Sequence, residues 1–189
     1  MESIVVTRCG WCKQDPLYTA YHDEEWGVPV RNPQKLFEML VLESMQAGLS
    51  WITVLRKRDA MRQAFMQFSP QHLAQASDSD LAVMLLNPEI IRNRLKIQSV
   101  RTNAQAFLRV AERENVAAYF WQFTDGEVKK NRWETLSQIP AVTEESTRMA
   151  RQLKKDGFAF LGPTTCYAFM QAVGMVNDHV TDCFRWSTC

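Results

Sequence analysis

The chain has 189 residues, of which 46% are hydrophobic and 23% charged. This length and balance fit a single domain over residues 1–189, or at most two small lobes, and they exclude disordered and fibrous chains. The formal net charge is only +1 at pH 7. Any affinity for nucleic acid or for an anionic membrane must therefore come from a local patch.

Helix-start and helix-stop signals predict an all-α fold. Asn32-Pro33 combines an N-cap residue with proline at the first helical position, Gly48 ends that helix, and Ser50 is expected to cap the next one. Further helices are predicted to begin at Pro70 and near Asp78, and to cover 94–115, 116–123, 144–155 and 164–173. No segment shows sustained alternation of apolar and polar residues, so strands are not expected.

The segments between the predicted helices and the start of the chain indicate where in the cell the protein is expected to be. The stretch 124–140 is expected to be the longest connection, with Asp125-Gly126 as a turn signal. The uncharged stretch 157–177 is interrupted by Gly162-Pro163, and the helical piece that remains spans roughly 20 Å, too short to cross a bilayer. No secretory pattern is visible at the start of the chain, and the five cysteines form no disulfide framework, so a cytoplasmic protein without membrane contact is expected.

Four potential metal ligands lie near the two ends of the sequence: Cys9, His22, His179 and Cys183. His179 and Cys183 are four residues apart, so on a helix both would face the same way. Two cysteines and two histidines suit a closed, tetrahedral, structural zinc site that would join the chain ends. The alternative is a set of unrelated buried residues, and Cys12 and Cys166 are competing thiols.

The helix that begins at Pro33 carries a carboxylate on its apolar side. At about 100° per residue, Glu43 projects on the same side as Leu36 and Leu40, whereas Glu38 projects on the opposite side. A buried carboxylate needs either a structural cation, such as an arginine, or a ligand that is cationic or donates hydrogen bonds. A flat, electron-poor ligand is favoured by the aromatic residues nearby in sequence: Trp11, Tyr18, Tyr21, Trp26 and Trp51.

The segment 154–165 joins two predicted helices through a turn bounded by Gly157 and Gly162. Backbone N–H groups at the start of the second helix, with Lys154 and Lys155 nearby, would suit a phosphate of DNA. The alternative is an ordinary helical hairpin with solvated lysines. Basic residues at 56–58, 92, 94 and 96 would extend a DNA-facing strip or simply form solvated faces.

Several motifs, spread over nearly the whole chain, are specific when taken together. They are Arg8-Cys9-Gly10-Trp11, Asp15-Pro16-Leu17-Tyr18, Tyr21-His22-Asp23, Glu25-Trp26-Gly27-Val28-Pro29, Leu36-Phe37-Glu38-Met39-Leu40, Gln46-Ala47-Gly48-Leu49-Ser50-Trp51, Ile90-Ile91-Arg92-Asn93-Arg94, Phe160-Leu161-Gly162-Pro163-Thr164-Thr165-Cys166-Tyr167 and Met175-Val176-Asn177-Asp178-His179. In these motifs the chain resembles the DNA-3-methyladenine glycosylase I family of helix-hairpin-helix repair enzymes.

The resemblance implies a helix-hairpin-helix glycosylase-like fold in which structural zinc ties the N- and C-terminal segments. It also implies a monofunctional enzyme that flips N3-methyladenine out of double-stranded DNA and hydrolyses its N-glycosidic bond. Free 3-methyladenine is released and an abasic site remains. The implied roles are zinc binding by Cys9, His22, His179 and Cys183, catalysis and base contact by Glu43, base binding by Trp11, Tyr18, Tyr21 and Trp51, and DNA binding by Leu49 as a wedge and by Gly162, Thr164 and Lys154.

Asn177 stands where many helix-hairpin-helix glycosylases have a catalytic aspartate. N3-methyladenine in DNA already carries a positive charge and leaves as a neutral base, so the enzyme mainly has to extrude, recognise and position it. Glu43 is the first candidate to activate the attacking water as well, and Asp178 is a weaker one. Departures from the family pattern at Leu95 and Ser44-Met45 are expected to affect fine specificity rather than activity.

Two other functions are weighed against this one. A non-catalytic, zinc-tethered DNA-binding module would explain the hairpin and the basic residues, but it gives Glu43 and its aromatic neighbours no purpose. A zinc hydrolase typically needs three protein ligands and an open position for water, whereas four ligands are present here. No feature indicates an oligomer, so a monomer is expected.

Overall fold

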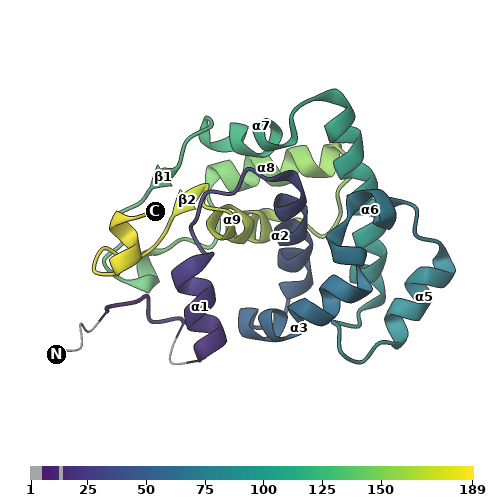
Figure 1. Cartoon of the computed structure of the whole chain (residues 1–189). Coiled ribbons are helices and arrows are strands. Elements are labelled where there is room, and N and C mark those ends of the chain that lie inside the picture. Colours follow the sequence, from purple (N-terminus) through teal and green to yellow (C-terminus); the bar gives the residue numbers. More distant parts are fainter. Residues whose placement is uncertain (1–5, 13–14) are drawn as a thin grey trace.

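The computed structural model describes residues 6–12 and 15–189, which are mostly helical (Figure 1). Residues 1–5, where the sequence shows no secretory pattern, lie outside these ranges. The α-helices are α1 (Pro16–Glu24), α2 (Pro33–Gln46), α3 (Trp51–Ala64), α4 (Pro70–Ala74), α5 (Asp78–Leu86), α6 (Arg94–Arg113), α7 (Val116–Trp121), α8 (Glu144–Lys155) and α9 (Pro163–Ala172). Short 3-10 turns are η1 (Met66–Phe68), η2 (Gln122–Thr124), η3 (Leu136–Gln138) and η4 (Phe184–Ser187).

Most of these helices start where the sequence supplies a capping side chain. Asn32 accepts from the Lys35 N–H, and Asn93 accepts from the Lys96 N–H. Ser50 is an exception, because its hydroxyl pairs with the Thr53 hydroxyl at 2.7 Å and makes no bond to the backbone. The all-α prediction is confirmed, with helix ends that differ by one or two residues at most places.

Two predictions about elements need correction. Helix α1 is not among the predicted helices, although Asp15-Pro16 is the same cap-and-proline signal as Asn32-Pro33. Asp15 accepts from two N–H groups of the first turn. Strands do occur: β1 (Lys129–Lys130) pairs in parallel with β2 (Val176–Asn177), with Lys129 opposite Val176. A two-residue ladder is too short to leave an alternating pattern in the sequence.

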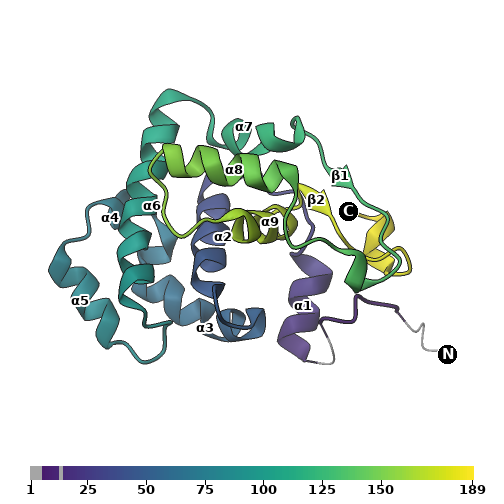
Figure 2. The same cartoon turned by 180° about the vertical axis from the view of Figure 1, so that it is seen from behind.

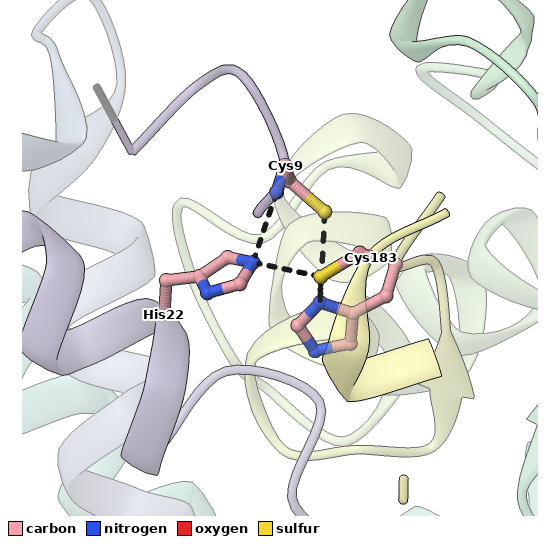
Figure 3. A group of neighbouring side chains, drawn as sticks. Cys9, His22 and Cys183 are labelled. Atoms are coloured by element: carbon pink, nitrogen blue, oxygen red, sulfur yellow. Dashed lines mark hydrogen bonds between the residues drawn. The ribbon is translucent and has the colours of Figure 1, made fainter. Parts of the chain in front are cut away.

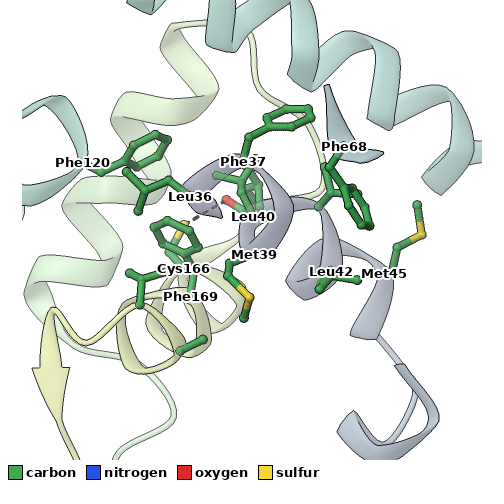
Figure 4. Packing of buried hydrophobic residues seen from close by; sticks show 14 of the residues in the cluster. Leu36, Phe37, Met39, Leu40, Leu42, Met45, Phe68, Phe120, Cys166 and Phe169 are labelled. Atoms are coloured by element: carbon green, nitrogen blue, oxygen red, sulfur yellow. Dashed lines mark hydrogen bonds between the residues drawn. The ribbon is translucent and has the colours of Figure 1, made fainter. Parts of the chain in front are cut away.

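Helix α2 is the centre of the molecule, and it packs against α3, α6, α7 and α9 (Figures 1 and 2). Every residue from Leu36 to Met45 is buried, so α2 has no polar face. Figure 4 shows side chains of α2 packed with Phe120 of α7 and Phe169 of α9. Because Glu38 is buried, the expectation that it projects away from the core is wrong. The two acids of α2 must therefore be distinguished by the groups that contact them and not by their exposure.

The N-terminal segment and the residues after β2 lie on the same side of the molecule in both views (Figures 1 and 2). The backbone N–H of Phe184 donates to the Thr7 carbonyl at 3.1 Å, which joins the two segments directly. Within the described ranges, no helix has both the length and the apolarity needed to cross a bilayer. The arrangement places Cys9 and Cys183 within reach of each other.

Candidate active site

Glu43 is the buried acid without a protein partner. Its side chain belongs to the last turn of α2, the residue is only 4% exposed, and its Oε2 is sealed from solvent. Neither carboxyl oxygen makes a hydrogen bond or an ion pair within residues 6–12 and 15–189. Burial raises the pKa of Glu43 to about 8. The structural-cation alternative is therefore absent for this residue in the described part of the chain.

Glu38, on the same helix, shows what a compensated acid looks like. Arg58 Nε donates to Glu38 Oε1 at 2.8 Å, and Arg62 lies at the same distance from that oxygen. Burial acts to raise the pKa of Glu38, but the charges of Arg58, Lys35 and Arg62 outweigh it and hold the pKa below its usual value. The contrast with Glu43 points to a ligand rather than to the protein as the partner of Glu43.

A pocket of about 380 Å³ opens beside Glu43. The predicted base-binding residues all line it, and they form a nearly continuous aromatic wall. The ring centroids of Trp11 and Tyr18 are 4.9 Å apart, and those of Tyr21 and Trp51 are 5.4 Å apart. Trp51 Nε1 is buried and has no acceptor among the described residues. The pocket thus combines flat aromatic surfaces with a carboxyl group that lacks a protein partner among the described residues, a set suited to a planar heterocycle.

The rest of the pocket wall was not expected from the sequence. One side is the loop that contains η3, with Leu136, Ile139, Pro140 and Ala141, within the stretch expected to be a plain connection. Another side is α9, and the remaining unpredicted lining residues are Trp26, Gln46, Tyr167, Ala168 and Gln171. No sequence signal identifies the loop residues, whereas Trp26 stands within the aromatic group that the sequence already singles out.

Cys9, His22, His179 and Cys183 form one buried cluster, and their ligand atoms all lie within 4.8 Å of one another. Cys183 Sγ is 3.5 Å from both His22 Nε2 and His179 Nδ1, and Cys9 Sγ is 3.6 Å from His179 Nδ1. Figure 3 shows Cys9, His22 and Cys183 converging from three separate segments. His179 and Cys183 are brought together by a turn, closed by the Cys183 N–H and the Val180 carbonyl, and not by the helical spacing considered for them.

The outer contacts of the two histidines fix which ring nitrogen faces the cluster. His22 Nδ1 lies 2.8 Å from Asp23 Oδ1, and His179 Nε2 lies 3.1 Å from the Trp26 carbonyl oxygen. Both partners accept, so those nitrogens carry the protons and the inward nitrogens present lone pairs. Cys12 and Cys166 instead donate their S–H groups to backbone carbonyls. The arrangement can hold one tetrahedral metal ion.

The thiols of the cluster share one proton unequally. Hydrogen bonding with Cys9, helped by His179 and His22, lowers the pKa of Cys183. The same contact with Cys183, together with burial, raises the pKa of Cys9. In this cluster the thiolate form of Cys183 is therefore favoured over that of Cys9.

The predicted DNA-binding residues occupy two surface segments that border the pocket. Leu49 is 41% exposed in the turn between α2 and α3, where Lys96 Nζ donates to the Met45 and Ala47 carbonyls at 2.8 and 2.6 Å. Gly162 precedes α9, and a side chain there would meet no atom within 4 Å. Thr164 is exposed and also lines the pocket, and Lys154 is exposed in the last turn of α8.

The loop between α8 and α9 is held in place by hydrogen bonds to a side chain of α6. Asn103, fully buried on α6, accepts from the Ala159 N–H at 2.7 Å and donates to the Ala159 carbonyl at 3.1 Å. Phe160 follows with a positive φ of 58° and a side chain that is 42% exposed. The two helices and this fixed loop form a helical hairpin whose turn faces solvent.

The remaining residues singled out from the sequence lie away from the pocket surface. Asn177 is buried and donates to the Trp186 and Cys189 carbonyls, so it holds the C-terminal turn. Asp178 is fully buried and accepts from four side chains. Ser44 and Met45 are fully buried, whereas Leu95 is 60% exposed.

Comparisons with known proteins identify relatives of this chain. A family model described as methyladenine glycosylase matches residues 11–186. The chain is 49% identical over 177 residues to DNA-3-methyladenine glycosylase 1 of Escherichia coli strain K12, covering 93% of this chain and 95% of that protein. A crystal structure of 3-methyladenine DNA glycosylase I superposes with a TM-score of 0.93 at 50% identity, over 94% of this chain and 98% of that one. A structure on 3-methyladenine recognition by the Staphylococcus aureus enzyme gives 0.91 at 34% identity, over 94% and 95%.

Proposed function

The chain belongs to the methyladenine glycosylase family, and from that premise we propose that it excises N3-methyladenine from double-stranded DNA. The reaction hydrolyses the N-glycosidic bond, releases free 3-methyladenine and leaves an abasic site. The observation that carries the proposal is Glu43, a buried carboxyl group at an aromatic pocket with no protein partner in the described ranges. A planar, positively charged base with an amino group supplies the charge and the donors that this carboxyl group lacks.

In this proposal Glu43 is the catalytic residue that contacts the base. It accepts hydrogen bonds from the amino edge and stabilises the positive charge, while Tyr21 and Trp51 stack on the base and Trp11 and Tyr18 complete the pocket. Because burial holds the pKa of Glu43 at about 8, the empty pocket contains mostly the protonated acid at pH 7. A bound cation favours the carboxylate, so binding of the charged nucleotide is coupled to release of a proton.

The chemical demand on the protein is modest, because the methylated base leaves as a neutral molecule. Extrusion, orientation and the electrostatic contribution of Glu43 then supply most of the acceleration. Asp178 is not suited to activate water, because its two oxygens already accept from four donors and the residue is fully buried. Glu43 is the remaining candidate to orient the attacking water.

We propose that Cys9, His22, His179 and Cys183 bind a structural zinc ion that ties the N- and C-terminal segments. With Zn–S of about 2.3 Å and Zn–N of about 2.0 Å, a tetrahedral site has S–N edges of about 3.5 Å. The sulfur–nitrogen separations of 3.5 and 3.6 Å in the cluster support this assignment. The ion would serve as a cross-link with no role at the reacting bond, and its thiol ligands must stay reduced, which supports a cytoplasmic location.

We propose further that the two segments at the pocket border hold the DNA. The hairpin of α8 and α9 acts as a helix-hairpin-helix motif, in which Gly162, Thr164 and Lys154 bind the phosphate backbone. Leu49 enters the gap left by the extruded nucleotide. The protein acts as a single-domain monomer in this proposal.

The test is chromatography of the free bases released from dimethyl-sulfate-treated duplex DNA. The wild type is expected to release 3-methyladenine with little 7-methylguanine, and Glu43→Gln to lose most of this activity. Glu112→Gln, the same change at an exposed position of α6, serves as the matched control and is expected to behave as wild type. A folded, zinc-loaded wild type that releases no base would refute the proposed enzymatic activity. The alternative function, a non-catalytic DNA-binding module, would then remain.

A further inference from the structure

Behind the pocket wall, Asp178 accepts four hydrogen bonds and has no cationic partner among the residues that the structure describes. Asn131 Nδ2 and Trp133 Nε1 each donate to its Oδ1 at 2.7 Å. Tyr167 Oη donates to its Oδ2 at 2.6 Å, and Gln171 Nε2 donates to the same oxygen at 2.8 Å. Tyr167 and Gln171 line the pocket, whereas Asp178 does not. A carboxylate only accepts, so each partner must turn its hydrogen toward it.

This contact determines the orientation of the Gln171 amide. Its nitrogen faces Asp178, so its oxygen Oε1 is directed away from that carboxylate. Oε1 makes no hydrogen bond within residues 6–12 and 15–189, yet it is not sealed from solvent, and Gln171 is part of the pocket lining. The opposite orientation would place an amide oxygen against carboxylate oxygens and would lose the bond to Asp178. Gln171 therefore presents an acceptor to the pocket.

We propose that Gln171 is a specificity-determining residue whose side-chain oxygen is a second acceptor for the base, in addition to Glu43, and that Asp178 is the positioning residue that orients it. This inference rests on the proposed glycosylase function. Two acceptors in one pocket favour a base that offers amino hydrogens at the recognised edge. They disfavour a base that offers a carbonyl oxygen there, because two acceptors facing each other leave both unpaired.

A matched pair of free bases tests this selectivity. In 3-methyladenine the C6 position carries an amino group, and in 3-methylhypoxanthine it carries an oxygen, with the methyl group at the same ring position. The dissociation constants of both bases are measured by quenching of tryptophan fluorescence in the zinc-loaded, full-length protein. The wild type is expected to prefer 3-methyladenine, and Gln171→Leu is expected to narrow the ratio of the two constants roughly tenfold.

Two further variants separate orientation from general structure. Asp178→Asn frees the Gln171 amide to turn, and it is expected to narrow the same ratio. Trp133→Phe removes another donor of Asp178 without touching the pocket lining, and it is expected to lower the melting temperature while the ratio stays at the wild-type value. If Asp178→Asn does not fold, the ratios of dissociation constants measured for Gln171→Leu and Trp133→Phe together test whether Gln171 determines the selectivity.

The outcomes are distinct. A ratio that narrows in Gln171→Leu but not in Trp133→Phe supports the proposal. A Gln171→Leu protein that keeps the wild-type ratio, or that loses affinity for both bases equally, overturns it while the glycosylase function stands. A wild type that neither binds 3-methyladenine nor releases it from methylated DNA would instead refute the proposed glycosylase function, on which this inference rests.

Discussion

Replacing Glu43 with glutamine should make the unliganded protein more stable, and increasingly so as the pH rises. Burial raises the pKa of this carboxyl group from 4.5 to about 8 in the folded protein. Below pH 4.5 the folded and unfolded chains both hold the proton, and Glu43 has no pH-dependent effect. Between pH 4.5 and 8 the unfolded chain releases the proton that the folded chain keeps, so the wild type loses stability across this window.

The size of the effect follows from the difference between the two pKa values. Each pH unit in the window lowers the free energy of unfolding by about 1.4 kcal/mol, which accumulates to about 5 kcal/mol at pH 8 and about 3 kcal/mol at pH 7. Glutamine does not ionise, so Glu43→Gln escapes this loss. If Glu43 contacts the base as proposed, its effect on stability is a typical trade between stability and activity.

Urea unfolding of both proteins, at intervals from pH 4.5 to 8.5, measures the difference directly. Glu38→Gln is the matched control on the same helix, because the pKa of Glu38 is held low by its cationic neighbours and its removal should cost stability above pH 4.5. Parallel stability curves for wild type and Glu43→Gln, or a variant that is less stable throughout, would refute the claim that Glu43 is buried without compensation.

Three further outcomes are expected. Chelation of zinc, or Cys183→Ser, should lower the melting temperature by roughly 10 °C for a loss of about 3 kcal/mol, with metal analysis alongside; an unchanged melting temperature would contradict the cross-link. Gly174→Ala should lower the free energy of unfolding in urea by several kcal/mol, because the new Cβ would lie 2.4 Å from the Val28 carbonyl carbon. The control Gly126→Ala has a similar positive φ and no atom within 4 Å, so it should lower that free energy by only about 1–2 kcal/mol. Equal losses in the two variants would argue against the clash at Gly174. Lys154→Ala should reduce the salt dependence of DNA affinity by about 0.9 in the log–log slope while free-base binding stays constant, and an unchanged slope would remove Lys154 from the phosphate contacts.

The sequence is informative where the signal is local. Caps such as Asn32 and Asn93 mark helix starts because they bond within their own first turn. Residue type identifies His179 and Cys183 as potential ligands, but it does not reveal that a turn, rather than a helix, brings their side chains together. The chemistry of a side chain can thus be predicted from the sequence, whereas the geometry that brings distant side chains together cannot.

Non-local contacts explain the rest. Helical spacing separates Glu43 from Glu38, yet both are buried. What distinguishes them is Arg58 of α3, which pairs with Glu38 but makes no ion pair with Glu43. Gln171 and Asp178 are likewise joined across the end of α9 and β2. Periodicity cannot reveal such partners, because it records which side of a helix is apolar and not what packs against it.

The cluster of cysteines and histidines has a consequence for biosynthesis. His22 and Cys183 are 161 residues apart in sequence, so Cys9 and His22 leave the ribosome long before their partners exist. At translation rates of roughly 5–20 residues per second, that interval is on the order of 10–30 seconds. During it the N-terminal thiol has no native partner, and the pocket lacks its α9 wall. A nascent chain therefore cannot form the complete pocket until α9 has been synthesised, and it cannot complete the cysteine–histidine cluster until Cys183 has been added.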